Sequence, residues 1–271
     1  MAVNYESNNV TAIASTNSLG LTVPTGTTTG NLLLAQIIHT NTQTVTPPSG
    51  YTLVLATTVG VQYQSTYYKI AVSGDTPGST HTFSMSATSL CGGGLTRYSG
   101  TNTNTPIFES ASGSGGAPTN TPSFSNTITN HMPDSMIVIH ARGAGGFITG
   151  MGSYAVVTSN PTWTEIYDSN YTNTIDFSSA HGLRTATTAT GNSSLVSTGD
   201  PAEFICHLIA IAPPLITTTT DTVTETDSLR YSMSMFPTDT ITETDTVTAE
   251  RSKTWVTQNK NTSTWVNPDK T

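Results

Sequence analysis

Short apolar runs alternate with turn residues along the first 213 residues of the chain. The runs at 32–38, 136–141 and 204–211 are nearly continuous, which is typical of strands buried on both faces. Residues 80–86 instead alternate polar and apolar side chains, so one face of that strand should be buried. The pattern predicts strands at 32–38, 51–55, 67–72, 80–86, 136–141 and 204–211.

Turn signals separate these strands, and no stretch has a helical period. Pro77 and Gly78 favour a turn because proline presets φ and glycine accepts a positive φ. The sequence therefore predicts an all-β fold, an antiparallel, jelly-roll-like β-sandwich. Residues 101–130 and 186–200 are polar and are expected to be long loops, where recognition usually takes place.

Composition supports this fold class and excludes others. Only 10% of the residues are charged, and 56 of the 271 are threonine, which fits a pleated strand better than a helix. Nine basic against 17 acidic residues argue against nucleic-acid binding, which needs lysine and arginine at the phosphates.

Charge divides the chain at Pro213-Pro214. Thirteen of the 26 charged residues lie in residues 1–213, and the other 13 lie in the much shorter remainder. We expect a neutral sandwich domain at 1–213, Thr/Asp/Glu repeat strands at 214–250 and a Trp-containing anchor segment at 251–271.

The tail contains two internal repeats. Thr220–Asp227 recurs as Thr238–Asp245, which places Val223 and Ile241 at equivalent positions. Neither face of such strands is apolar enough to fold alone, so they require a partner. The sequence Thr-Trp-Val also recurs ten residues apart and contains the expected docking residues, Trp255 and Trp265; a solvated C-terminus is the alternative. The acidic positions Asp221, Glu225 and Asp227 could bind Ca²⁺ if symmetry mates bring them together, or could simply keep an edge strand soluble.

Catalytic and cofactor motifs are not found. The sequence has no Gly-x-Ser-x-Gly elbow, Walker loop, His-Glu-x-x-His or Cys-x-x-Cys. We expect no enzyme activity, no cofactor and no resident metal. The glycines at 92–94 indicate thinning of a strand or a bulge. Histidines such as His39, His140 and His207 lie in apolar strands, where a hydrogen-bonded structural role is expected. Cys91 and Cys206 should be buried free thiols, with one inter-sheet disulfide as the alternative.

No apolar run reaches the length of a membrane span, and residues 1–6 do not have the pattern of a secretory signal. A lysine-poor, Thr-rich surface nevertheless suits life outside the cell. A virion surface protein, made in the host cytoplasm and released by lysis, satisfies both expectations.

An ordered series of motifs gives a resemblance to a known family. The series is Gly30-Asn31-Leu-Leu-Leu-Ala, Pro48-Ser-Gly-Tyr-Thr-Leu-Val, Tyr68-Lys-Ile-Ala, Thr80-His-Thr-Phe and Gly93-Gly-Leu-Thr-Arg-Tyr-Ser-Gly. It resembles a β-sandwich family of bacteriophage virion proteins and bacterial surface proteins, with Tyr51 where tryptophan is usual and Asn31 where aspartate is usual. The Trp/Asn/Lys/Thr repeats look like those at the ends of phage virion proteins. The resemblance implies a surface sandwich and no catalytic residues.

The expected function is therefore that of a phage structural protein (capsid decoration, head fibre or tail fibre) that binds other virion proteins through its tail. A homo-oligomer is expected, with a trimer favoured, and neither nucleic acid nor a membrane as partner. One alternative is an adhesin that binds a host surface glycan through Tyr98, Phe108 and Tyr154. Another is a subunit of an extracellular filament whose tail adds a strand to the next copy.

Overall fold

The computed structural model describes residues 2–41, 43–115, 128, 132–144, 163–171, 175–184, 203–214, 246–251 and 254–259. The fold divides the chain into two compact units, 1–217 and 218–271. Every regular element in the described ranges is a strand.

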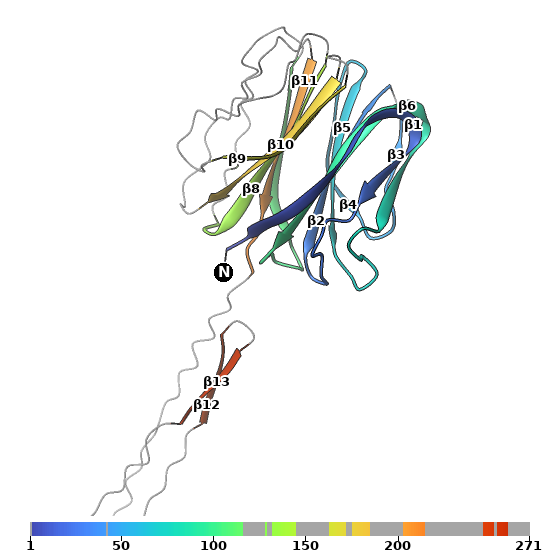
Figure 1. Ribbon diagram of the computed structural model, residues 1–271. Coiled ribbons are helices and arrows are strands. Elements are labelled where there is room, and N and C mark those ends of the chain that lie inside the picture. The colour runs from blue at the N-terminus through green and yellow to red at the C-terminus, as the bar shows by residue number, and fades with distance from the viewer. Residues whose placement is uncertain are drawn as a thin grey trace, which may run out of the picture. The chain divides into compact units, whose positions relative to one another are not determined.

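Unit 1 contains two antiparallel sheets (Figure 1). The first, sheet A, has the strand order β1-β6-β2-β5-β4, and β3 pairs with β6. Its strands are β1 (Asn4–Thr22), β2 (Leu32–Thr40), β3 (Val45–Thr46), β4 (Thr52–Val59), β5 (Gln62–Ile70) and β6 (Thr80–Ser99). The second, sheet B, has the order β7-β11-β8-β10-β9. Its strands are β7 (Ile107–Gly115), β8 (Ser135–Ala144), β9 (Thr164–Tyr171), β10 (Ile175–Arg184) and β11 (Glu203–Ile211).

The connectivity differs from the jelly-roll-like order expected from the sequence. A jelly roll builds its two sheets from Greek keys, so its chain passes between them repeatedly. Here β1 to β6 all belong to sheet A and β7 to β11 all belong to sheet B. The all-β prediction is confirmed, and the jelly-roll-like order is wrong for the described sheets.

Strand β2 shows why a continuous apolar run was informative. Leu32 to His39 are all buried, and successive side chains point to opposite faces. Leu33, Ala35 and Ile37 enter a cluster within sheet A, whereas the alternate residues face sheet B. The predicted burial of this strand on both faces is confirmed.

Sheet A curls over its own outer face. Figure 1 shows β1 and β6 bending together, and Thr11 Oγ1 of β1 donates to the Gly20 carbonyl of the same strand at 2.7 Å. The β1–β6 register shifts between Thr11 and Ala14 and again between Thr16 and Ser18. Such bulges bend a strand and redirect its side chains.

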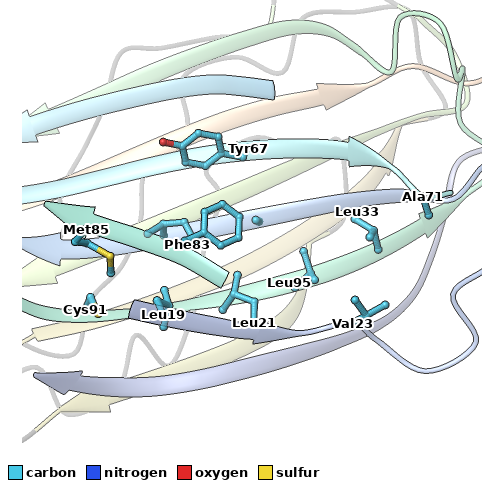
Figure 2. Packing of buried hydrophobic residues seen from close by; sticks show 12 residues of the cluster. Leu19, Leu21, Val23, Leu33, Tyr67, Ala71, Phe83, Met85, Cys91 and Leu95 are labelled. Atoms are coloured by element: carbon cyan, nitrogen blue, oxygen red, sulfur yellow. The ribbon is translucent and has the colours of Figure 1, made fainter. Parts of the chain in front are cut away.

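The curl encloses an apolar cluster that belongs to sheet A alone (Figure 2). Phe83 and Met85 from the first half of β6 contact the same cluster as Cys91 and Leu95 from its second half. This cluster, which we call the sheet A core, comprises Leu19, Leu21, Val23, Leu33, Ala35, Ile37, Tyr67, Ala71, Phe83, Met85, Cys91 and Leu95.

The two sheets pack together through two further clusters. One joins Leu32, Leu34 and Tyr98 of sheet A to β8 and β11. The other joins Ile13 and Ile38 of sheet A to β9 and β10. A fourth cluster, on the face of sheet B that points away from sheet A, includes Ile137, Ile139, Cys206 and Leu208. The arrangement is sandwich-like, with apolar clusters within the curl of sheet A, between the two sheets and on the far face of sheet B.

Five strands of unit 1 were not anticipated, namely β1, β3, β7, β9 and β10, and one of them lies in an expected loop. Strand β7 occupies 107–115, within the segment predicted to be a polar loop at 101–130. Strands β1 and β9 are rich in Thr, Ser and Asn, and β10 mixes apolar residues with Asp, Ser, His and Arg, so their apolar pattern is weak. The predicted loop at 186–200 lies outside the described residues.

Unit 2 contains one described hairpin, β12 (Thr246–Arg251) and β13 (Thr254–Asn259). The two strands pair antiparallel, with Ala249 opposite Val256 and Glu250 opposite Trp255. The remainder of the predicted repeat strands at 214–250 lies outside the described residues.

Candidate functional site

Of the three aromatic residues expected to face a ligand, the two that the structure describes, Tyr98 and Phe108, belong to different clusters. Tyr98 is fully buried between the sheets and meets the ring of Tyr5 edge-on at 6.1 Å. It is therefore a core residue, and the expectation that it faces a ligand is wrong. Phe108 is half-buried against the outer cluster of sheet B. Tyr154 lies outside the described residues.

The predicted anchor residues fall mainly outside the described ranges. Trp255 lies in β13, opposite Glu250. Val223, Ile241 and Trp265 lie outside the described residues, as do the acidic positions considered for Ca²⁺. Their roles remain predictions.

What the fold does assemble is a polar layer between the two sheets. It lies in the inter-sheet space that also contains the two apolar inter-sheet clusters. Its members come from β2, β5, β8, β9 and β11 and are all buried. The polar layer consists of Gln36, Gln64, Thr66, His140, Arg142, Tyr167 and His207.

Two glutamines connect the sheets at the centre of this layer. Gln36 Nε2 donates to Gln64 Oε1 at 3.0 Å and to the Ala141 carbonyl of β8 at 2.9 Å. Gln64 Nε2 donates to the His140 carbonyl at 2.9 Å, and the Tyr167 hydroxyl donates to Gln36 Oε1 at 2.9 Å. Buried amides are stable only when their hydrogen bonds are satisfied, so these bonds fix how the sheets are aligned.

The glycine run of β6 makes room for Tyr167. A Cβ at Gly94 would lie 2.4 Å from Tyr167 Cζ, and a Cβ at Gly93 would lie 2.3 Å from the Gln36 carbonyl oxygen. The β2–β6 register stays regular through these residues. The glycines therefore thin the strand, as the sequence predicted, and let a tyrosine of sheet B reach Gln36.

Two histidines face each other within sheet B. His140 of β8 and His207 of β11 are direct cross-strand partners. Their Nδ1 atoms lie 3.0 Å and 2.9 Å from the single hydroxyl oxygen of Thr66, and His207 Nε2 lies 3.0 Å from Thr57 Oγ1.

The hydrogen-bond geometry limits the tautomers of the two rings. A threonine hydroxyl donates only one hydrogen, so at most one ring can accept from Thr66 and at least one ring must donate to it. His140 Nε2 has no hydrogen-bond partner among the described residues, and an unpaired buried donor is rarer than an unpaired acceptor. His140 therefore carries its hydrogen on Nδ1 and donates to Thr66. Each ring nitrogen of His207 has a hydroxyl partner, and in the neutral ring one of the two, Nδ1 at Thr66 or Nε2 at Thr57, is the acceptor.

Both rings are neutral at physiological pH. Burial, together with the charge of the neighbouring His207, lowers the pKa of His140 to about 3. Burial alone lowers the pKa of His207 to about 3. A general base should have a pKa near the working pH, so these imidazoles are suited to holding structure rather than to moving protons at neutral pH.

Arg142 connects the sheets at another part of the layer. Its Nη1 donates to the carbonyls of His39 and Tyr63 in sheet A, each at 2.5 Å, and its Nη2 donates to Gln62 Oε1. Burial lowers the pKa of Arg142 to about 9, while the charges of Asp176 and Glu203 act in the opposite direction. The guanidinium thus remains charged at neutral pH and satisfies three acceptors of the opposite sheet.

A second polar cluster lies at the edge of the sheet A core. Asp75 Oδ1 accepts from Lys69 Nζ at 2.7 Å and lies 3.0 Å from His81 Nε2. Tyr51 OH lies 2.8 Å from His81 Nδ1. Burial and the charge of Asp75 both raise the pKa of Tyr51 above its usual value. A phenol with a raised pKa is a poor nucleophile, which argues against a catalytic role. The contacts of Asp75 instead fasten the 71–79 turn to the sheet.

The described residues contain no group of three or more His, Cys, Asp or Glu side chains placed to hold a metal ion. Cys91 and Cys206 are free and buried, one in the sheet A core and one on the far face of sheet B. The buried-thiol prediction is confirmed. Within the described ranges, no helix has the length and hydropathy of a membrane span.

A scan against protein-family models and searches of curated proteins and of solved structures give no match. The class that the fold itself defines is an all-β protein with two antiparallel sheets joined through a hydrogen-bonded polar layer.

Proposed function

We propose that the chain is a structural protein of a bacteriophage particle, displayed on the particle surface and attached or oligomerised through its C-terminal repeats. The observation that carries the proposal is the position of the family-like motifs. All five belong to sheet A and include residues that build it: β2, the turn before β4, the end of β5 and both halves of β6.

The individual residues of these motifs have framework roles. Asn31 Oδ1 accepts from the Thr28 amide at 2.9 Å and so shapes the turn before β2. Tyr51 packs edge-on against Phe83 at 5.0 Å. Gly93 and Gly94 allow close approach of neighbouring groups. A resemblance confined to framework residues supports shared architecture, and particle-surface proteins need architecture more than chemistry.

The tail supports the attachment role. It belongs to a compact unit separate from the sandwich-like unit, and its only described element is a two-stranded hairpin. Such a hairpin is marginally stable in water without further packing. Trp255 in this hairpin recurs as Trp265, and tryptophan is enriched at interface hot spots.

Location in the particle tests the proposal directly. Antibodies raised against residues 1–217 should label intact particles from a host lysate in immunogold electron microscopy. The matched arm uses antibodies against a cytoplasmic protein of the same host. Absence of label from particles, with the chain recovered only in the soluble lysate, would overturn the proposal.

Oligomeric state tests the role of the tail. In light scattering after size exclusion, the full chain should form a homo-oligomer, with a trimer favoured, and a chain ending at Pro213 should be monomeric. The W255A/W265A variant should dissociate, while Q258A, altered in the same hairpin, should not. A truncated chain that still oligomerises would show that the tail is not the assembly device.

The glycan-binding alternative is weaker because Tyr98 is buried. A glycan array probed with residues 1–213 discriminates between the two functions. Binding to a defined glycan class would favour an adhesin, and silence across the array would favour a passive coat role.

A further inference from the structure

The inter-sheet space has an unusual distribution of polarity. In sandwiches the layer between two sheets is normally the apolar core. Here the polar layer contains two buried histidines and a buried arginine. Meanwhile sheet A encloses an apolar core of its own, and sheet B has an apolar cluster on its far face.

We propose that the polar layer is an acid-sensitive joint, in which protonation of His140 and His207 releases sheet B from sheet A while the sheet A core stays folded. The two imidazoles are the trigger, and Thr66 is the contact through which they hold the opposite sheet.

Protonation removes a hydrogen bond that holds the two sheets together. A second ring proton on His207 occupies the one nitrogen lone pair that accepts from sheet A, at Thr66 or at Thr57. A proton on His140 Nε2 creates a buried donor with no partner among the described residues. Because His140 and His207 are direct cross-strand partners, two imidazolium charges would also repel each other in a poorly hydrated site.

The charges around the two rings do not compensate for such protons. Strand β8 contributes Arg142, which is itself a cation and donates to the His39 carbonyl of β2. The contributions of β5 and β4 to the rings, Thr66 and Thr57, are neutral, and β9 contributes the phenol of Tyr167. The acidic groups Glu203 of β11 and Asp176 of β10 act on Arg142.

The pKa values of both histidines are shifted in the direction that an acid-sensitive joint requires. Their pKa values in the folded protein, about 3, lie below the ordinary value of 6.5. The neutral rings therefore favour the closed state above pH 6.5, and this stabilisation is lost as pH falls through 6.5 toward 3 because the open state binds protons more tightly. The two histidines together bind up to two protons on opening, which sets the steepness, and the gap between the two pKa values sets the pH range over which the stabilisation is lost.

The test compares the full chain at pH 7 and pH 4.5 by hydrogen exchange and by binding of the dye ANS. At pH 4.5 exchange should accelerate first in β5, β8 and β11 and later in the β1–β6 segment around the sheet A core. ANS emission should rise about fivefold as the inter-sheet surface becomes exposed, and both changes should reverse at pH 7. Exchange that accelerates first around the sheet A core would overturn the proposal.

Two variants identify the trigger. H140N/H207N places amide atoms near the former Nδ1 positions and removes both titrating groups, so the acid midpoint of opening should move down by about one pH unit. The matched control is H81N, which removes a histidine next to Asp75 at the edge of the sheet A core and should leave the order of opening unchanged. An unchanged midpoint in H140N/H207N would overturn the proposal.

A third variant keeps the proposal testable if the double variant does not fold at pH 7. T66V leaves both imidazoles in place and removes only the bridging hydroxyl. Opening should then occur at higher pH, because the neutral rings no longer hold sheet A. A T66V midpoint equal to that of the parent chain would refute Thr66 as the contact.

Discussion

The phenol of Tyr167 occupies the space that any side chain at Gly94 would need. A Cβ added there would lie 2.4 Å from Tyr167 Cζ, and the same hydroxyl donates to Gln36 across the sheet interface. One glycine in sheet A and one tyrosine in sheet B thus determine how closely the two sheets approach at this point.

Replacing Gly94 with alanine should destabilise the protein by about 1–3 kcal/mol, the usual cost of overpacking. Urea denaturation measures the change. The matched control is G74A, since a Cβ at Gly74 meets no atom within 4 Å and should change stability by about 0.5 kcal/mol or less. Adding Y167A should make the effects of the two substitutions clearly non-additive; full additivity would mean that the two residues do not interact.

Removing the Arg142 side chain should be more costly than removing a partly exposed arginine. R142A leaves the carbonyls of His39 and Tyr63 without their donor, so we expect a loss of about 3–5 kcal/mol in the free energy of unfolding. R97A removes contacts to Glu6 and the Gly26 carbonyl near the surface and should cost about 1 kcal/mol. Equal losses would show that the inter-sheet bonds of Arg142 have no special weight.

Asp176 should give a pH dependence opposite to that of the histidines. Burial, and next the charge of Asp168, raises the pKa of this carboxyl from 3.8 to about 7. The folded state therefore binds the proton more tightly than the unfolded state, and this group lowers stability increasingly as pH rises from 3.8 to 7. D176N should stabilise the protein by about 2 kcal/mol at pH 8 and by much less at pH 4. Urea denaturation at both values checks the sign; a variant equally destabilised at both would contradict the expected shift.

The two thiols should be unreactive in the native protein. Burial raises the pKa of Cys91 to about 11 and that of Cys206 well above its usual value, and thiolates rather than thiols react with disulfide reagents. With the reagent DTNB, both cysteines should react only as fast as the chain unfolds, and both should react at once in guanidinium. Rapid native labelling of either thiol would show that its strand opens locally.

Much of the apolar framework could be predicted from the sequence because a continuous run such as 32–38 has few structural alternatives. The same run concealed Gln36, whose partners Gln64 and Tyr167 lie 28 and 131 residues away. The available signal was a polar residue inside an apolar strand. His140 and His207 show the same signal in their own strands. Local pattern cannot pair such residues, because their partners depend on which sheet faces which. Tyr98 was misjudged because a tyrosine near a strand end has the same local pattern whether its ring is buried or exposed.

The separation of sheets along the chain has a consequence for synthesis. Every strand partner of sheet A lies within residues 4–99, and its enclosed core draws only on those residues. Domains generally fold as units while the ribosome is still adding residues. The first 99 residues can therefore complete the ladder of sheet A and bury its own apolar core before β7 to β11 are made. Sheet B would then form against a completed sheet A. Gln36, Gln64 and Thr66 would already be in place on the face of sheet A that His140, Arg142 and His207 approach.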